Sequence, residues 1–168
     1  MYAVPAPERN ACLDGAIEFC HAARKDTGSP SSALPKAMIT PLRVLLIEDS
    51  EDDAQLVLRE LRRSGYEPRW ERHESAAAVD DALERQTWDV ILCDYHLPTF
   101  SALAALQLLR ERGVDLPVIV VSGEILDEVV SSVLQAGARD YVLKDNLANL
   151  GVAVTRELRR AAAQHPDR

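Results

Sequence analysis

The sequence is poor in cysteine and aromatic residues, and it contains no long apolar run. Only 3 of its 168 residues are cysteine, an odd number without the close pairing typical of a disulfide framework or a zinc site. No apolar stretch approaches the roughly 20 residues of a membrane-spanning helix. The first ten residues carry proline and charge instead of the apolar core of a secretion signal. These absences predict a cytoplasmic protein with reduced thiols and no membrane partner.

Basic residues are also fewer than acidic ones. Lys and Arg together number 19 against 27 Asp and Glu, so the formal net charge is -8. Binding to nucleic acid through its phosphates needs clustered cationic side chains, so we expect no nucleic-acid partner. Hydrophobic residues make up 47% of the chain, which is enough to bury a core.

The first part of the chain, residues 1–41, differs in composition from the rest. It contains five of the nine prolines and a linker-like stretch at residues 27–32. Residues 10–25 carry apolar side chains at the spacing of one short helix. We predict that residues 1–41 form a mostly disordered N-terminal extension and that residues 42–165 form the folded domain.

Within the predicted domain, short apolar runs alternate with helical patterns. The runs are residues 44–47, a weaker one around Trp70, and residues 90–93, 118–121 and 141–143. Continuous apolar runs are typical of parallel strands that are covered on both faces. Each run is followed by apolar residues at helical spacing, the last of these segments extending from Leu147 to about Gln164. Five β/α repeats of about 25 residues predict an α/β three-layer sandwich with a five-stranded parallel sheet and five helices.

Reactive side chains directly follow the predicted strands. Glu48 and Asp49 follow the first strand, Asp94 the third, Ser122 the fourth and Lys144 the fifth. In doubly wound folds, ligands bind at the carboxyl ends of the parallel strands, near the point where the strand order reverses. We therefore expect three acids, one hydroxyl and one amine to lie together at one edge of the sheet.

The chemistry of this set is internally consistent. Two carboxylates about 4 Å apart repel each other by roughly 4 kcal/mol at an effective dielectric constant of about 20. A hard divalent cation relieves this repulsion, and a set of oxygen ligands with few protein contacts suits Mg²⁺. An Asp carboxylate can act as a nucleophile and form an acyl phosphate, whose oxygens an ammonium and a hydroxyl can hold.

Four segments of the domain resemble the signature segments of bacterial response-regulator receiver domains of the CheY-like, single-domain type: VLLIEDSEDDA, DVILCDYHLP, VIVVSGE and GARDYVLKD. The resemblance covers about residues 42–163. It implies the strand order 2-1-3-4-5, which periodicity alone leaves open. It also implies a signalling switch that a sensor histidine kinase or a phosphotransfer protein phosphorylates.

The resemblance implies the residues that hold the metal and the phosphoryl group. Asp94 resembles the phosphoacceptor, and Asp49 and Asp94 resemble direct Mg²⁺ ligands. Glu48 resembles the acid that acts on the metal through water. The backbone carbonyl of His96 resembles the third protein ligand.

The resemblance further implies the residues that respond to phosphorylation. Ser122 resembles the switch hydroxyl, Tyr141 the switch aromatic, and Lys144 the invariant lysine of the family. The side chains of His96 and Glu124 occupy positions that could tune the rate of hydrolysis.

The resemblance also implies how the signal leaves the domain. No DNA-binding output domain is expected to follow it, so the output would be contact with an unknown downstream protein. This contact would use the face made by the fourth helix, the fifth strand and the fifth helix. A monomer and a phosphorylation-dependent homodimer are both compatible with it.

Two departures from the family pattern concern the loops around the site. Asp145 follows Lys144, where receivers usually carry proline. Ala102 replaces a glycine that is common eight residues after the phosphoacceptor. Neither change removes a reacting group.

Other interpretations remain open from the sequence alone. Asp49 could simply cap the following helix, and Asp52 and Asp53 are first-turn acids that the helix dipole favours. A Mg²⁺-dependent phosphohydrolase with an Asp nucleophile is an alternative, but haloacid-dehalogenase enzymes need a second acid where this chain has His96. A receiver-like scaffold that works without phosphorylation is the third hypothesis.

Overall fold

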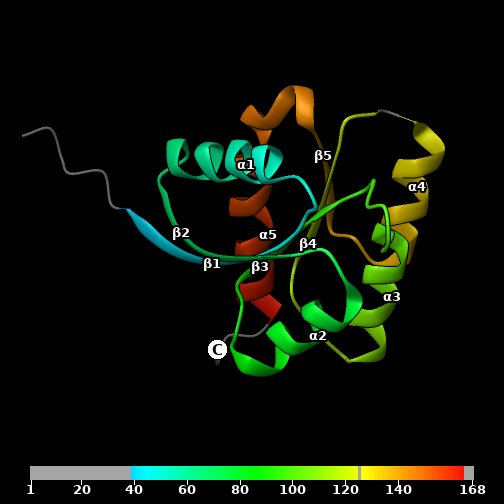
Figure 1. Cartoon of the computed structure of the whole chain (residues 1–168). Coiled ribbons are helices and arrows are strands. Elements are labelled where there is room, and N and C mark those ends of the chain that lie inside the picture. The colour runs from blue at the N-terminus through cyan, green and yellow to red at the C-terminus, as the bar shows by residue number, and fades with distance from the viewer. Residues whose placement is uncertain (1–38, 125, 165–168) are drawn as a thin grey trace, which may run out of the picture. The chain divides into compact units, whose positions relative to one another are not determined.

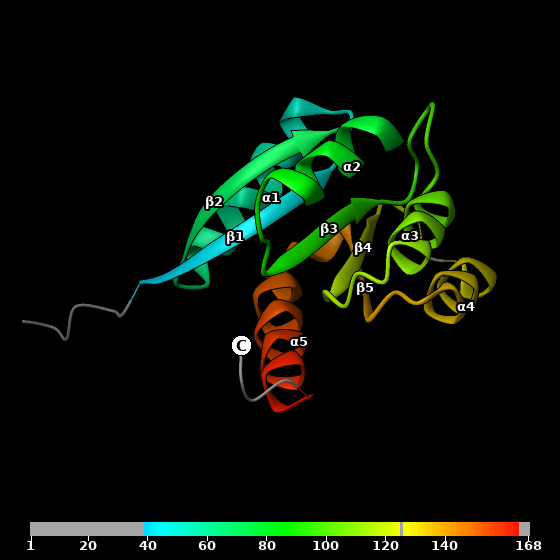
Figure 2. The same ribbon diagram turned by 90° about the horizontal axis from the view of Figure 1, so that it is seen from below.

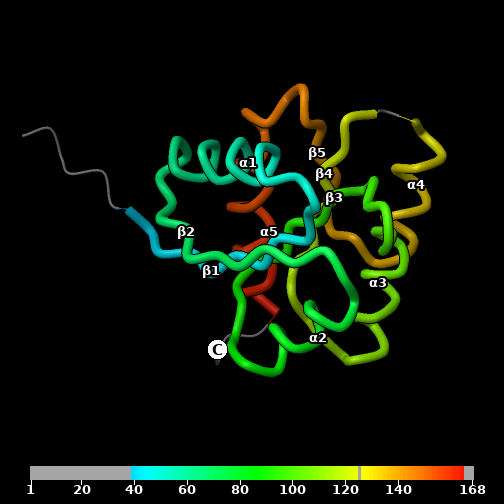
Figure 3. Tube along the Cα trace, viewed as in Figure 1, coloured from blue at the N-terminus to red at the C-terminus, as the bar shows by residue number. Residues whose placement is uncertain are grey.

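The computed structural model describes residues 39–124 and 126–164, so the helix predicted at residues 10–25 lies outside the described residues. The strands are β1 Thr40–Ile47, β2 Tyr66–His73, β3 Val90–Asp94, β4 Val118–Ser122 and β5 Asp140–Leu143. The helices are α1 Glu51–Arg63, α2 Ala76–Arg85, α3 Ala102–Glu111, α4 Asp127–Ala136 and α5 Leu150–Gln164. A short 3₁₀ helix, η1 Lys144–Asn149, joins β5 to α5. Strands and α-helices thus alternate along the chain (Figure 1; the trace is easiest to follow in Figure 3).

The five strands form one parallel sheet in the order β2-β1-β3-β4-β5, which confirms the predicted fold. β1 pairs with β2 on one side and with β3 on the other, so Val44 lies between Trp70 and Val90. The chain first moves from β1 outward to β2 and then returns to β3 on the other side. This reversal places the carboxyl ends of β1 and β3 next to each other, where a doubly wound fold binds its ligand.

Helices cover both faces of the sheet (Figure 2). On one face, α1 and α5 bury their apolar side chains against one side of the strands, including Leu58, Leu61 and Val154. On the other face, α2, α3 and α4 contribute a second apolar core that contains Val79 and Leu106. Burial on both faces explains why the strands read as continuous apolar runs in the sequence.

Short polar residues and glycine set the ends of the helices. Ser50 is the N-cap of α1, where its side chain accepts a hydrogen bond from the backbone N–H of Asp53. Ser75 caps α2 in the same way, accepting a hydrogen bond from the backbone N–H of Ala78. Gly137 ends α4 with a φ of 115°, a left-handed conformation that glycine adopts without steric cost.

Two details differ from the sequence prediction. β1 begins at Thr40, two residues before the predicted boundary at residue 42. Leu147 lies in the 3₁₀ helix and not in the last α-helix, which begins at Leu150. Apolar spacing alone does not separate a 3₁₀ turn from the α-helix that follows it, because both place side chains three residues apart on one face. Within the residues that the structure describes, none of the helices combines the length and hydropathy needed to cross a bilayer.

Candidate functional site

Three carboxylates meet at the carboxyl edge of the sheet. Glu48 and Asp49 follow β1, Asp94 is the last residue of β3, and one oxygen of each lies within 4.8 Å of the others. Glu48 and Asp94 are buried, whereas Asp49 is exposed. A cluster of hard oxygen donors with one open side fits a divalent cation such as Mg²⁺ that keeps part of its water shell.

Lys144 supplies the positive charge of the site. It lies at the start of η1, and its Nζ is 3.2 Å from Asp94 Oδ2, 3.3 Å from Glu48 Oε2 and 2.5 Å from Asp53 Oδ2. Burial alone would lower the pKa of Lys144. The hydrogen bond to Asp53 and the charges of Asp94 and Glu48 outweigh it, so the pKa of Lys144 is raised above its ordinary value. The lysine therefore stays charged at neutral pH and partly offsets the repulsion among the acids.

Asp53 is a member of the site that the sequence did not identify. It lies in the first turn of α1, as predicted, but its carboxylate also pairs with Lys144, which is 91 residues further along the chain. A first-turn acid already has a sufficient explanation in the helix dipole, so the sequence carries no separate signal for this contact. Its nearness to the strand ends follows from the fold alone.

Glu48 has an unusual proton affinity. Burial raises its pKa to about 7, and the nearby charge of Asp94 adds to this effect. The hydrogen bond from the backbone N–H of Ser50 to Glu48 Oε1, at 3.0 Å, and the ammonium of Lys144 act in the opposite direction. Near neutral pH the site without metal thus holds Glu48 in both protonation states.

The alternative interpretation of Asp49 as a helix cap is wrong. The N-cap of α1 is Ser50, one residue later, and it is the side chain of Ser50 that accepts the capping bond. Asp49 is left with an exposed carboxylate beside two buried ones. The capping bond of α1 therefore does not explain an acid at this position.

The remaining predicted residues surround the loop after β4. Ser122 is fully buried at the end of β4, and its hydroxyl accepts a hydrogen bond from the backbone N–H of Glu124 at 3.3 Å. Tyr141 of β5 donates its hydroxyl hydrogen to the backbone carbonyl of Glu124. His96 Nε2 lies 3.7 Å from Glu124 Oε2, so the pair joins the loops that follow β3 and β4. Glu124 thus contacts a residue of the loop after β3, the last residue of β4 and a residue within β5.

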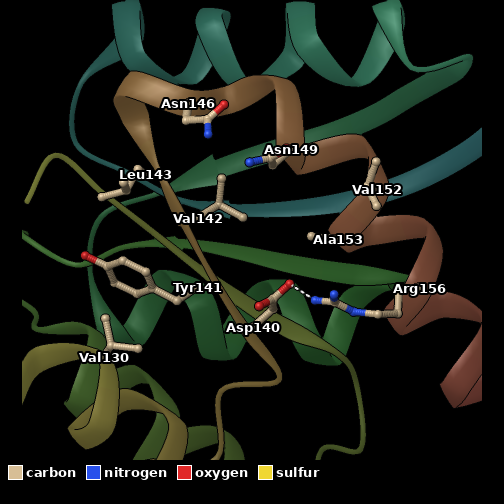
Figure 4. A pocket seen from close by; sticks show the side chains of 10 residues that line it. All are labelled: Val130, Asp140, Tyr141, Val142, Leu143, Asn146, Asn149, Val152, Ala153 and Arg156. Carbon is tan, nitrogen blue, oxygen red and sulfur yellow. Dashed lines mark hydrogen bonds and ion pairs between the residues drawn. The ribbon is translucent and has the colours of Figure 1, made fainter. Parts of the chain in front are cut away.

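A groove of about 420 Å³ lies on the outer side of β5, between α4 and α5. Figure 4 shows Tyr141 beside Val130 at one end of this groove and the ion pair of Asp140 with Arg156 at the other. Val152 of α5, with 67% of its surface exposed, lines the same groove. The phenol that contacts the β4–α4 loop therefore belongs to a residue that also lines this surface.

Replacing Lys144 by methionine is expected to destabilise the protein when no divalent metal is present. The buried acids Glu48 and Asp94 lose their shared counter-ion, and leaving such charges unpaired costs about 3 kcal/mol. Urea unfolding in EDTA at pH 8 measures this loss directly. The matched control is Arg63, which lies at the far end of α1 and, among the described residues, pairs with Glu60 three residues away. We expect Arg63→Met to change the free energy of unfolding by less than about 0.5 kcal/mol. Equal stability of the Lys144 variant and the wild type would show that the acids do not need the lysine.

Residues 44–163 match the family model of the response regulator receiver domain. The sensory/regulatory protein RpfC of Xanthomonas campestris pv. campestris is 29% identical over 135 residues, and the transcriptional regulatory protein PrrA of Mycobacterium tuberculosis is 35% identical over 124 residues. Each match covers 73% of this chain but only 18% of RpfC and 52% of PrrA, so the chain spans about half or less of these relatives.

A solved structure extends the likeness to three dimensions. The receiver domain of the sensor histidine kinase PA1611 from Pseudomonas aeruginosa is 29% identical, with a TM-score of 0.60, and the match covers 71% of this chain and 98% of that domain. That receiver holds a magnesium ion coordinated in its active-site cleft. The matched sequence, the strand order and the acids at the strand ends agree, and the chain belongs to the response regulator receiver domain family.

Proposed function

We propose that the domain is a phosphoaccepting signalling switch in which Asp94 takes up a phosphoryl group with the help of Mg²⁺. The observation that carries this proposal is the position of Asp94. Its buried carboxylate ends β3, shares a 4.8 Å cluster with Glu48 and Asp49, and lies 3.2 Å from the ammonium of Lys144. A nucleophile, a set of hard oxygen ligands and a mobile positive charge are the parts that phosphoryl transfer to a carboxylate requires.

The metal would be held by the carboxylates of Asp49 and Asp94, by the backbone carbonyl of His96, and by Glu48 through water. Bound there, Mg²⁺ would neutralise part of the charge on the acids and on the incoming phosphoryl group. Asp94 itself performs the substitution. One of its oxygens forms a bond to phosphorus while the bond from phosphorus to the donor breaks, and the donor leaves with that electron pair.

Lys144 and Ser122 would hold the product. In the resting protein, the Lys144 ammonium is shared among Asp53, Glu48 and Asp94. An acyl phosphate on Asp94 offers stronger acceptor oxygens, which draw the ammonium away from Asp53. The Ser122 hydroxyl, now an acceptor for the Glu124 N–H, can instead donate to a phosphoryl oxygen. Both movements would shift the loops that follow β4 and β5.

The switch would then reach the groove between α4 and α5 through Tyr141. The hydroxyl of Tyr141 donates a hydrogen bond to the backbone carbonyl of Glu124 in the β4–α4 loop. A movement of Ser122 and Glu124 would therefore change this hydrogen bond and the position of the aromatic ring. We propose that a downstream protein reads this face of α4, β5 and α5. We also propose that the phosphoryl group comes from a sensor histidine kinase or a phosphotransfer protein, as membership of the family supports.

The phosphohydrolase alternative has less support. His96 occupies the position two residues after Asp94 where an acid would be needed, and its side chain lies beside Glu124. We propose that these two side chains tune the lifetime of the acyl phosphate and that the domain turns over no external substrate. Incubation with acetyl phosphate and Mg²⁺ should add one phosphoryl mass to the protein, whereas EDTA should prevent the addition. Sustained hydrolysis of p-nitrophenyl phosphate would instead favour the enzyme.

Replacing Ser122 by alanine is expected to separate phosphorylation from the conformational response. The variant keeps Asp94 and its acids, so acetyl phosphate should still label it. Because the hydroxyl that links the phosphoryl group to the β4–α4 loop is lost, residues 123–126 and 140–143 should show no change in amide hydrogen exchange on labelling. Wild-type protein should show a change in both segments. A normal exchange response in the alanine variant would remove Ser122 from its proposed role.

A further inference from the structure

Arg72 is a charged residue on a strand face that is otherwise apolar. Alternate residues of β2 point to the same side of the sheet. Tyr66 and Trp70 pack against the core under α1 and α5, and Arg72 is the next residue on that side. The register pairs Arg72 with Leu46, close to the end of β1. Its side chain is therefore placed to reach the loop that connects β1 to α1.

The guanidinium of Arg72 holds this loop at three points. Nη1 donates to the backbone carbonyl oxygens of Glu48 and Asp49, each at 3.0 Å. Nε lies 3.2 Å from Oε2 of Glu51, the first residue of α1. The side chain of Arg72 is only 26% exposed. One planar group thus contacts three of four consecutive residues from two separate nitrogen atoms, whereas a lysine has only one nitrogen.

The residues that Arg72 holds include two of the three acids of the site. Glu48 continues the strand pairing by one more bond, since its N–H donates to the carbonyl of His73 at 3.1 Å. Beyond this bond the chain turns into the cap of α1. The direction in which the carboxylates of Glu48 and Asp49 leave the backbone therefore depends on how this turn is fixed, and Arg72 contacts the carbonyl groups of both residues.

We propose that Arg72 is a positioning residue for the metal site. It fixes the backbone of Glu48 and Asp49 and thereby orients their carboxylates. This inference rests on the proposed function, because it assumes that these acids bind Mg²⁺. Groups that orient metal ligands without touching the metal typically contribute 10- to 100-fold to metal affinity. Arg72 also has an effect of opposite sign, because a positive charge near the acids repels a cation. The two effects make opposite predictions for its removal.

Magnesium titration of two variants separates these effects. Arg72→Lys keeps the charge but loses the planar group that contacts both carbonyls through Nη1 and Glu51 through Nε, and Arg72→Met loses the charge as well. We expect Mg²⁺ to bind about 10-fold more weakly to each variant than to the wild type, as measured by isothermal titration calorimetry. Arg63→Met, which makes the same change in net charge at the far end of α1, should leave the affinity within about twofold. Urea unfolding in EDTA identifies a variant that has lost its fold, and the lysine variant then carries the test.

Each other result overturns the inference. If Arg72 acts only through its charge, Arg72→Met binds Mg²⁺ more tightly and Arg72→Lys binds it as the wild type does. If Arg72 serves only the stability of the fold, both variants unfold more easily but bind Mg²⁺ within twofold of the wild type. A wild-type protein that binds no Mg²⁺ would remove the proposed metal site itself, whereas normal binding by the wild type and both variants would remove only the role of Arg72.

Discussion

Replacing Asp94 by asparagine is expected to abolish phosphorylation of the domain. The amide is nearly the same size as the carboxylate, but it has no anionic oxygen to attack phosphorus. Buried at the end of β3, Asp94 is the acid that lies closest to the Lys144 ammonium among the three acids of the metal cluster. In the proposed function Glu48 and Asp49 serve the metal, and Glu48 also accepts the N–H of Ser50, so neither acid is expected to replace Asp94. We therefore expect labelling to fall to the background level and not to a fraction of the wild-type level.

Intact-mass measurement after incubation with acetyl phosphate and Mg²⁺ tests this expectation. Wild-type protein should gain one phosphoryl group and lose it at alkaline pH, as an acyl phosphate does. Asp52→Asn is the matched control, since Asp52 is an exposed acid in the first turn of α1, next to the site but outside the cluster. The control should be labelled as the wild type is. An alkali-labile phosphoryl group on the Asp94→Asn protein would place the acceptor elsewhere.

The sequence predicts the elements of this fold better than their arrangement. Apolar runs of four or five residues mark β1, β3 and β4 because these strands are buried on both faces. β2 is weaker, since it lies at the edge of the sheet and carries Glu67, Arg69 and Glu71. The order of the strands depends on which way each crossover turns, and no local pattern records that direction. It could be predicted only from the resemblance to receiver domains.

The sequence likewise predicts some residues of the site but not others. Glu48, Asp49, Asp94 and Lys144 could be predicted as neighbours because each one lies at or just after the end of a strand, and parallel strands end at one edge. Asp53 and Arg72 could not be predicted in this way. One lies within a helix turn and the other within a strand, and their contacts join segments 91 and 24 residues apart. Charged residues in such positions are usually explained by helix dipoles or solvation, and only the packed structure brings these two to the acids.

The raised pKa of Glu48 leads to a second large effect, on stability. In the unfolded chain Glu48 has its ordinary pKa near 4.5, whereas in the folded domain burial raises the value to about 7. Between these values the folded state keeps a proton that the unfolded state has lost. The stabilisation from this proton is fully present below about pH 4.5, and it is lost as the pH rises through about 7. The total change corresponds to about 3 kcal/mol, at 1.36 kcal/mol per pKa unit.

Other shifted groups leave this pH window unchanged. The lowered pKa values of Glu71 and Asp89 affect stability in acid, where those carboxylates take up protons. Lys144 has a raised pKa, so its contribution is fully present at neutral pH and is lost only in strong base. The difference between the wild type and Glu48→Gln therefore isolates Glu48, because every other titrating group is common to both proteins.

We expect the wild-type protein in EDTA to lose about 2.5 kcal/mol of unfolding free energy between pH 5 and pH 8, relative to Glu48→Gln. Urea unfolding at several pH values in this range measures the difference. Addition of 10 mM Mg²⁺ should reduce it, because a cation bound by the acid cluster favours the ionised carboxylate and stabilises the folded state by mass action. Parallel pH profiles of the two proteins in EDTA would show that Glu48 ionises normally in the folded domain. The burial of this carboxyl group would then be offset by the N–H of Ser50 and the ammonium of Lys144.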